Sequence, residues 1–382
     1  MTDKLRLTLA QLNPTLGDFK GNLSKARDAW VQAKAANADM LVLPEMFLSG
    51  YQAQDLVQKP AFTADAKAKL ETFAADCKDG PAIGIGLPMR EGDKVYNCYA
   101  ILKNGKIATI IRKHHLPNYK VFDEPRTFDT GDMSGPYVIA DARIGTPICE
   151  DAWYEDVCEM LQETGAEILV SPNASPYYRG KFEKRINTMV SRVIETGLPM
   201  VYLNLIGGQD DQVFDGGSFV LNPGGELALQ MPLFEEAIEH VDFTHTDDGW
   251  RAEHGAKAHF PDEWEQDYHV MVTALRDYMD KTGFKKVLLG LSGGIDSAIV
   301  ATIAVDALGA ENVRCVMMPS EYTSQESLDD AVAVADALGC QYHNVPISQG
   351  RDAITQTLAP MFEGLEADVT EESYIFSSEK MS

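Results

Sequence analysis

A cysteine at residue 149 stands where an apolar run gives way to acidic residues. The run covers Ile144–Cys149, and Glu150 and Asp151 follow it. Reactive side chains often lie at the ends of strands. A helix-like segment that begins near Trp153 would also favour a thiolate at its N-terminal end. A nucleophilic cysteine and a buried structural cysteine both fit this stretch, since most free cysteines are simply buried apolar residues.

Two more reactive side chains stand at the ends of apolar segments earlier in the chain. Glu45 follows Leu-Val-Leu-Pro, and Lys113 ends a run rich in isoleucine. A thiol needs a base, and the tetrahedral intermediate of amide hydrolysis needs a cation or N–H donors. Glu45 is therefore a candidate base for Cys149, and Lys113 with the backbone at Glu150 a candidate stabiliser of the intermediate. Taken alone, Glu45 also fits a strand-end carboxylate that faces water.

The adjacent residues His114 and His115 raise the question of a metal site. Neighbouring residues on a strand point to opposite faces, so the two imidazoles cannot easily share an ion if the strand continues. The six cysteines lack CxxC spacing, and no cluster of cysteines or carboxylates stands near the pair. The sequence therefore predicts no metal site here.

A second candidate site lies in the stretch Ser-Gly-Gly-Ile-Asp-Ser. It follows an apolar strand predicted over 285–291 and precedes a helix predicted over 298–308. Glycines let the backbone approach an anion, and N–H groups at a helix N-terminus bind phosphate. No lysine follows, which excludes a Walker A motif. The candidate nucleotide-binding residues are Gly290, Leu291, Ser292, Gly293, Gly294, Ile295, Asp296 and Ser297.

Two α/β regions must position these residues. In the first, alternating strands, helices such as 181–196 and a hairpin at Asn104-Gly105 precede and follow the candidate triad. In the second, strands and helices alternate, which predicts a parallel sheet with helices on both faces. The stretch 243–261 lacks periodicity. We expect a first domain over 1–245, a linker over 246–262 and a second domain over 263–382.

Composition restricts the class of protein. The formal net charge of −25 argues against nucleic-acid and anionic-membrane binding. The sequence contains no apolar run of transmembrane length and no secretory signal, so no membrane association is expected. Six scattered cysteines are typical of a reducing compartment, and the predicted location is cytoplasmic.

Three segments around the candidate triad resemble the signatures of the nitrilase and amidase superfamily: Leu43-Pro44-Glu45, Arg112-Lys113-His114 and 147–151. The resemblance spans roughly 4–243 and implies a four-layer α-β-β-α sandwich with a Glu-Lys-Cys triad. It also implies that Glu124 orients Lys113. By resemblance to the glutaminase members, the glutamine-contacting positions are Tyr119, Ser175 and Lys181, with Tyr51 and Trp153 lining the pocket. For Ser175 and Lys181, a solvated loop is the alternative.

The glycine-rich stretch resembles the pyrophosphate loop of ATP pyrophosphatases, and Met317–Ser324 is similar to the adenine-contacting segment of NAD+ synthetases. Together the two halves resemble the glutamine-dependent NAD+ synthetases, the second half being a partial Rossmann-like domain of the ATP pyrophosphatase type. The resemblance implies that glutamine supplies ammonia, which amidates deamido-NAD+ after adenylation by ATP. It further implies ATP with Mg2+ as co-substrate, magnesium near Asp296, no prosthetic group, and a homo-oligomer.

The resemblance ends near Glu372. The stretch Ser373–Ser382 does not match the family, and the segment 263–382 is less than half as long as the family's synthetase domain. Two functions therefore stay open. One is the complete ligase reaction. The other is a stand-alone amidase, or a non-catalytic remnant, with a vestigial nucleotide domain, from which we expect no NAD+ even with free ammonium.

Overall fold

The computed structural model describes residues 3–361. The chain forms two compact units, which divide along the sequence between Ala274 and Leu275. This division falls inside a helix, α5 (Glu263–Thr282). The domain boundaries expected from the sequence stay a prediction, and the non-matching stretch 373–382 lies outside the described residues.

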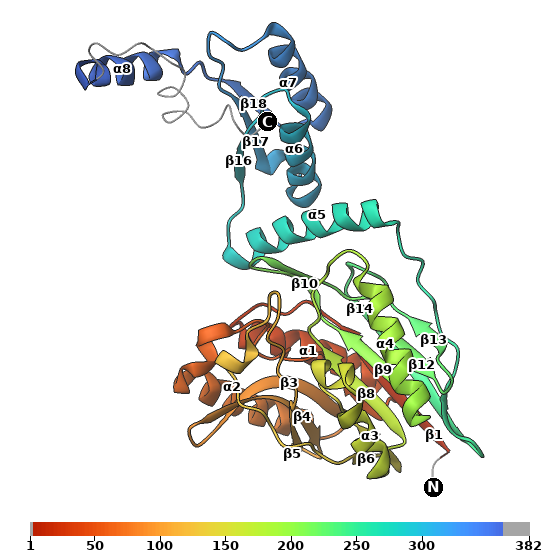
Figure 1. Ribbon diagram of the computed structural model, residues 1–382. Helices are drawn as coiled ribbons and strands as arrows, with labels where there is room; N and C mark the ends of the chain where they lie inside the picture. The colour runs from red at the N-terminus through yellow and green to blue at the C-terminus, as the bar shows by residue number, and fades with distance from the viewer. Residues whose placement is uncertain (1–2, 362–382) are drawn as a thin grey trace. The chain divides into compact units, whose positions relative to one another are not determined.

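Two sheets lie at the centre of the first unit (Figure 1). The seven-stranded sheet has the order β15-β14-β1-β2-β3-β4-β5, and the six-stranded sheet has the order β13-β12-β9-β8-β7-β6. The strands are β1 Lys4–Gln11, β2 Met40–Val42, β3 Ala82–Glu91, β4 Lys94–Lys103, β5 Lys106–Arg112, β6 Tyr137–Ile139, β7 Ala142–Gly145, β8 Ile168–Asn173, β9 Met200–Asn204, β12 Phe219–Asn222, β13 Glu226–Gln230, β14 Ala237–Thr246 and β15 Gly249–Ala252, with a separate hairpin of β10 Ile206–Gln209 and β11 Gln212–Asp215.

Helices cover the outer face of each sheet. Helices α1 (Phe19–Ala35) and α2 (Pro60–Asp76) contact strands of the seven-stranded sheet, whereas α3 (Glu155–Glu163) and α4 (Lys181–Thr196) contact the six-stranded sheet. One apolar core lies between the sheets and one lies under each helical layer. The predicted four-layer α-β-β-α sandwich is confirmed. Short 3₁₀ helices complete the unit: η1 Gln54–Gln58, η2 Glu124–Arg126 and η3 Cys149–Trp153.

Local sequence explains several elements directly. At the predicted hairpin, Asn104 and Gly105 both have positive φ, as a two-residue type I′ turn between β4 and β5 requires. Helix α4 covers the predicted residues 181–196, and its buried positions recur at helical spacing on one face.

The stretch 246–262, expected to be a linker, contains a short strand in its first part. Strand β15 lies there and pairs antiparallel with β14. Only Trp250 and Ala252 of this strand are buried. Two inward positions in four residues are too few to show the alternation that identifies a strand.

The second unit contains a parallel sheet of order β16-β17-β18, with β16 Val287–Gly290, β17 Val313–Met317 and β18 Gln341–Asn344. The crossover helices α6 (Ile295–Leu308) and α7 (Gln325–Leu338) contact each other and therefore lie on one face. On the other face Leu288 is 69% exposed. Helices on both faces were predicted, but successive right-handed crossovers in one direction place both helices on the same side. The unit continues with η4 Ala310–Asn312, α8 Ser348–Leu358 and η5 Ala359–Met361.

Among the described residues, no helix has the length and apolar character needed to cross a membrane.

Candidate active site

A buried cluster of charge lies beyond the ends of β2 and β5. Lys113 directly follows β5, and its Nζ lies 2.8 Å from Glu45 Oε1. Its second partner is Glu124, at the start of η2, whose two carboxylate oxygens lie 2.9 and 3.0 Å from the same Nζ. The Lys113 and Glu45 side chains are fully buried, and that of Glu124 is 4% exposed. Three predicted site residues therefore form one cluster.

The charges of this cluster support one another. Burial alone lowers the pKa of Lys113, but the carboxylates of Glu124 and Glu45 outweigh burial and raise that pKa well above the usual value. Burial raises the pKa of Glu124 to about 7, and the Lys113 ammonium opposes this shift. At neutral pH the cluster therefore contains a firmly charged ammonium and a carboxyl group that is close to its titration point.

Two further donors hold the Glu45 carboxylate in place. The side-chain amide of Asn97, on β4, donates to Oε1 at 2.7 Å. The backbone N–H of Ala174, just after β8, donates to Oε2 at 2.9 Å. Sequence reasoning missed Asn97, because a polar residue inside a buried strand has no local signature. The only available signal was its inward position among apolar neighbours.

Cys149 begins η3, four residues after the last residue of β7, and its side chain interacts with Glu45 and Lys113. Its φ of 49° lies in the left-handed region, which non-glycine residues adopt at a cost and which often marks functional sites. Burial and the charge of Glu45 raise the pKa of the thiol well above its usual value, although Lys113 opposes them. The expectation that a helix N-terminus favours a thiolate here is therefore wrong. Helix α3 begins only at Glu155, and burial together with the charge of Glu45 disfavours the thiolate.

Three predicted substrate-contacting residues line or adjoin one cavity of about 370 Å³ in the first unit. Tyr119 and Lys181 belong to its lining. Trp153 lies beside them, because the Lys181 ammonium sits 4.2 Å from the centre of its ring. The Tyr119 hydroxyl donates to both oxygens of Glu150, at 2.9 and 3.1 Å. The side chain of Glu150 is thus a further polar group at this site, which sequence analysis considered only for its backbone.

Burial affects the pKa of Lys181, which lines this cavity, and the pKa of Glu150, which Tyr119 contacts, in opposite ways. It lowers the pKa of Lys181 to about 8, helped by the nearby Arg185. It raises the pKa of Glu150, whereas the Tyr119 hydroxyl and nearby lysines oppose the shift. The Lys181 ammonium at the cavity and the Glu150 carboxylate that Tyr119 contacts are thus both partly desolvated, which strengthens their pairing with a ligand.

Ser175 is buried at a turn that a polar network holds. Arg185 on α4 is fully buried; it donates to the carbonyl oxygen of Ser175 at 2.6 Å and forms an ion pair with Asp215 at 2.8 Å. Asn204 accepts from the Ser175 N–H at 2.9 Å. A solvated loop at Ser175 is thereby excluded. Lys181 is likewise only 5% exposed.

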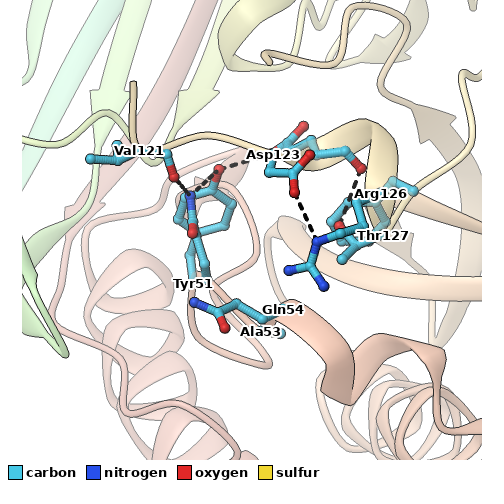
Figure 2. A pocket seen from close by; sticks show the side chains of 10 residues that line it. Tyr51, Ala53, Gln54, Val121, Asp123, Arg126 and Thr127 are labelled. Carbon is cyan, nitrogen blue, oxygen red and sulfur yellow. Dashed lines mark hydrogen bonds and ion pairs between the residues drawn. The ribbon is translucent and has the colours of Figure 1, made fainter. Parts of the chain in front are cut away.

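Tyr51, predicted to line the substrate pocket, lines a different cavity from Tyr119 and Lys181. Its hydroxyl donates to Glu124 at 2.9 Å, and it lines a separate cavity of about 120 Å³ with Gln52, Asp123 and Arg126 (Figure 2). Figure 2 shows this cavity between the segment after Tyr51 and the segment around Asp123. Tyr51 therefore contacts the charge cluster from the side of Glu124.

The prediction about His114 and His115 rested on a strand that does not continue. Strand β5 ends at Arg112, and ligand atoms of both imidazoles lie within 4.8 Å of each other and of Asp156. Their positions are also explained without a metal. His115 Nε2 lies 2.8 Å from Asp156, and His114 Nδ1 lies 2.8 Å from the carbonyl oxygen of Gly131.

In the second unit, the candidate nucleotide stretch 290–297 runs from the last residue of β16 into the first turn of α6, which begins at Ile295 and not at the predicted residue 298. The hydroxyls of Ser292 and Ser297 lie 3.1 Å apart, and Ser297 also donates to the carbonyl oxygen of Gly294. Gly293 has a φ of 84°, and a Cβ there would lie 2.2 Å from the carbonyl oxygen of Ser327. Leu291 is buried, whereas Asp296 in the first turn of α6 is exposed.

The fold and the two sites define a class of protein: a carbon-nitrogen hydrolase unit followed by a nucleotide-binding α/β unit. The carbon-nitrogen hydrolase family matches residues 6–248, and the NAD synthase family matches residues 267–372. Among solved structures, an amidase from Nesterenkonia resembles 63% of this chain with a TM-score of 0.57 at 23% identity, which concerns the fold alone.

Relatives with both parts match nearly the whole chain. The glutamine-dependent NAD(+) synthetase of Rhodobacter capsulatus is 53% identical over 98% of this chain and 68% of its own length. The corresponding enzyme of Thermotoga maritima is 39% identical over 97% of this chain and 70% of its own length. The structure of the Acinetobacter baumannii synthetase, determined with ADP, has a TM-score of 0.92 at 36% identity and covers 97% of this chain and 70% of its own. The chain belongs to the glutamine-dependent NAD+ synthetase family.

Proposed function

We propose that the first unit hydrolyses the side-chain amide of glutamine, with Cys149 as nucleophile, Glu45 as general base and Lys113 as the cation that stabilises the intermediate. The observation that carries this proposal is the fully buried pair of Glu45 and Lys113, with the second Glu45 oxygen on the Ala174 N–H. A buried charge is stable only when an opposite charge or hydrogen bonds compensate its lost hydration. Such compensated groups are concentrated at functional sites.

The first chemical step starts from the protonated thiol. Glu45 takes the proton of Cys149 as the sulfur attacks the amide carbon, so no free thiolate needs to form in a buried site. Negative charge then develops on the carbonyl oxygen. The Lys113 ammonium, kept charged by Glu45 and Glu124, stabilises it together with the backbone N–H of Glu150.

Glu45 completes both halves of the reaction. It returns the proton to the departing nitrogen, so the C–N bond breaks, ammonia leaves and a thioester remains on Cys149. A water molecule then attacks this thioester while Glu45 again accepts a proton. Transfer of that proton to the sulfur releases glutamate and restores the thiol.

Lys181 at the 370 Å³ cavity and Glu150 beside Tyr119 support recognition of a zwitterionic amino acid. Lys181 offers a cation for an α-carboxylate, and Glu150 offers an anion for an α-ammonium group. Tyr119 orients the Glu150 carboxylate, and Trp153 packs against the Lys181 ammonium. A neutral side-chain amide would then extend toward Cys149.

In the second unit, we propose that residues 290–297 bind the phosphates of ATP, which adenylates deamido-NAD+ before ammonia displaces AMP. The positive φ of Gly293, which a residue with a Cβ could adopt only with strain, and the hydroxyls of Ser292 and Ser297 fit a phosphate-binding loop. Mg2+, when bound with ATP, neutralises phosphate charge, and the exposed Asp296 would hold it. A homo-oligomer and a cytoplasmic location remain proposals as well.

The test of the first unit is the substitution Cys149→Ala, measured by glutamate release from glutamine. We expect hydrolysis to fall below detection while the melting temperature stays within a few degrees, because only one sulfur is removed. The matched control is Cys158→Ala, another buried cysteine, which should keep turnover. Retained hydrolysis in the Cys149→Ala protein would exclude the proposed nucleophile.

A further inference from the structure

One buried carboxylate joins the segment that follows β5 to the turn that carries the nucleophile. Asp151 is 2% exposed, and its two oxygens accept three hydrogen bonds, each from a backbone N–H. Oδ1 accepts from His114 at 3.0 Å and from His115 at 2.7 Å. Oδ2 accepts from Ile148 at 3.0 Å. The proposed reaction gives this side chain no chemical step.

The donors identify what the carboxylate connects. Two of them directly follow Lys113, and the third directly precedes Cys149. Strand β5 belongs to the seven-stranded sheet and β7 to the six-stranded sheet. Hydrogen bonds between neighbouring strands fix the position of a residue within its own sheet, but they do not set the distance between two sheets. At this point Asp151 spans that separation.

The chemistry of the contact requires a carboxylate. Three N–H donors need a group that only accepts, and an ionised carboxylate has acceptor sites on both oxygens. An asparagine of the same shape would turn its own N–H₂ toward one of these donors. Burial raises the pKa of Asp151 to about 6, so keeping the charged form inside the protein is unfavourable and needs these three bonds.

We propose that Asp151 is a positioning residue that fixes the separation between the Lys113 ammonium and the Cys149 sulfur across the two sheets. It touches no reacting atom and acts only through the backbone on either side. This inference rests on the proposed glutaminase reaction. Because a misplacement of about 1 Å can lower a rate about 100-fold, a small shift of either segment is enough to matter.

The experiment compares Asp151→Asn and Asp151→Ala with the parent chain, using glutamate release at pH 8. We expect kcat to fall about 10-fold for the asparagine variant and about 100-fold for the alanine variant, with KM for glutamine changing less than about threefold. The graded loss follows from the contacts, because asparagine can keep the two bonds to Oδ1 and loses the one to Oδ2.

The matched control is Asp156→Asn. This carboxylate also lies close to His115, but it contacts the ring and not the backbone N–H, and it is exposed. Its kcat should stay within about twofold of the parent value, since no bond across the two sheets is removed. An equal loss in this control would show that any charge change here lowers activity, and would overturn the proposal.

A second measurement does not depend on glutamine being the substrate. The rate of Cys149 alkylation by iodoacetamide, followed by peptide mass spectrometry, should fall severalfold in Asp151→Asn, because Lys113 favours ionisation of that thiol. Slower alkylation would support the proposal even if the parent released no glutamate. An unchanged kcat and alkylation rate, a rise in KM alone, or a loss of more than about 10 °C in Tm would each overturn it.

Discussion

The two functional regions of this protein are built in opposite ways. In the first unit, Glu45, Lys113 and Glu124 come from separate segments, and their charges are almost completely buried. In the second unit, the candidate nucleotide site is one continuous loop, and most of its residues are partly or fully exposed. Its contacts are short-range hydrogen bonds among hydroxyls and backbone, such as that between Ser292 and Ser297.

The difference indicates what each site depends on. A buried charge cluster is stable only while every partner is present, so its properties belong to the packing of two sheets. A phosphate-binding loop depends on backbone conformations that a few glycines permit. Substitutions at the first site should therefore affect chemistry, and substitutions at the second should affect whether a ligand fits.

Of the substitutions that test the comparison between the two regions, Glu45→Gln should have the largest effect. An amide cannot accept the proton of Cys149, so kcat for glutamine hydrolysis should fall by about 10²- to 10⁴-fold. The amide also leaves Lys113 with one anionic partner, Glu124. Steady-state glutamate release, with circular dichroism to confirm folding, measures the effect.

The control for this substitution is Glu163→Gln, an exposed carboxylate at the end of α3, which should behave as the parent does. A Glu45→Gln protein that keeps more than about a tenth of the parent kcat would assign the base to another group. In that case the contrast between the two regions, in which substitutions at the first affect chemistry and substitutions at the second affect ligand binding, would not hold.

Sequence reasoning succeeded where the signal is local or carried by a motif. The turn at Asn104 and Gly105, the extent of α4 and the strand-loop-helix order around Gly293 appear in the structure as expected, although α6 begins at Ile295, three residues before its predicted start. Each of these depends on residues within one short stretch, where hydrophobic periodicity and glycine positions are informative.

The remaining features depend on contacts between distant segments. Asn97 and Arg185 hold Glu45 and the Ser175 turn, yet as single polar residues in buried elements they have no pattern of their own. The protonation state of Cys149 was misjudged for the same reason, because two sheets bury the thiol and a distant carboxylate opposes its ionisation. Such effects follow from tertiary packing, which a local motif does not report.

The next effect concerns the second region. Gly293→Ala adds a Cβ that would lie 2.2 Å from a backbone oxygen, at a φ of 84° that alanine avoids. We expect ATP affinity, measured by calorimetry, to fall at least about 10-fold. Glutamine hydrolysis in the absence of nucleotide should stay unchanged.

Gly350→Ala is the matched control, since that glycine lies in α8 with nothing within 4 Å of an added Cβ. It should bind ATP as the parent does. Equal ATP binding by the Gly293→Ala protein would contradict a phosphate-binding role for this loop. It would also contradict the expectation that substitutions in the second region affect whether a ligand fits.

The smallest effect is a pH dependence at Glu124. The folded-state pKa is about 7, above the usual value of 4.5, because burial outweighs the attraction of Lys113. Below pH 7 the carboxyl group takes up a proton in the folded protein. Lys113 then has one anionic partner instead of two, so Glu45 is held more tightly and becomes a weaker base. We therefore expect hydrolysis to decline as the pH falls from 8 to 6.

Stability should change in the opposite direction. A carboxyl group whose pKa is raised by folding stabilises the folded state fully below its unfolded pKa, and this contribution disappears as the pH rises through about 7. Between pH 8 and 6, this group alone should thus make the protein more stable while making it less active.

Glu124→Gln resembles the protonated form, so its hydrolysis should be roughly tenfold below the parent at pH 8 and within about threefold of it at pH 6. Its denaturant midpoint should exceed that of the parent more at pH 8 than at pH 6, with Glu163→Gln as the control that shows neither change. A variant whose activity declines with pH as steeply as that of the parent would place the titrating group elsewhere in the cluster. The charge of Glu124 would then not be what sets the basicity of Glu45.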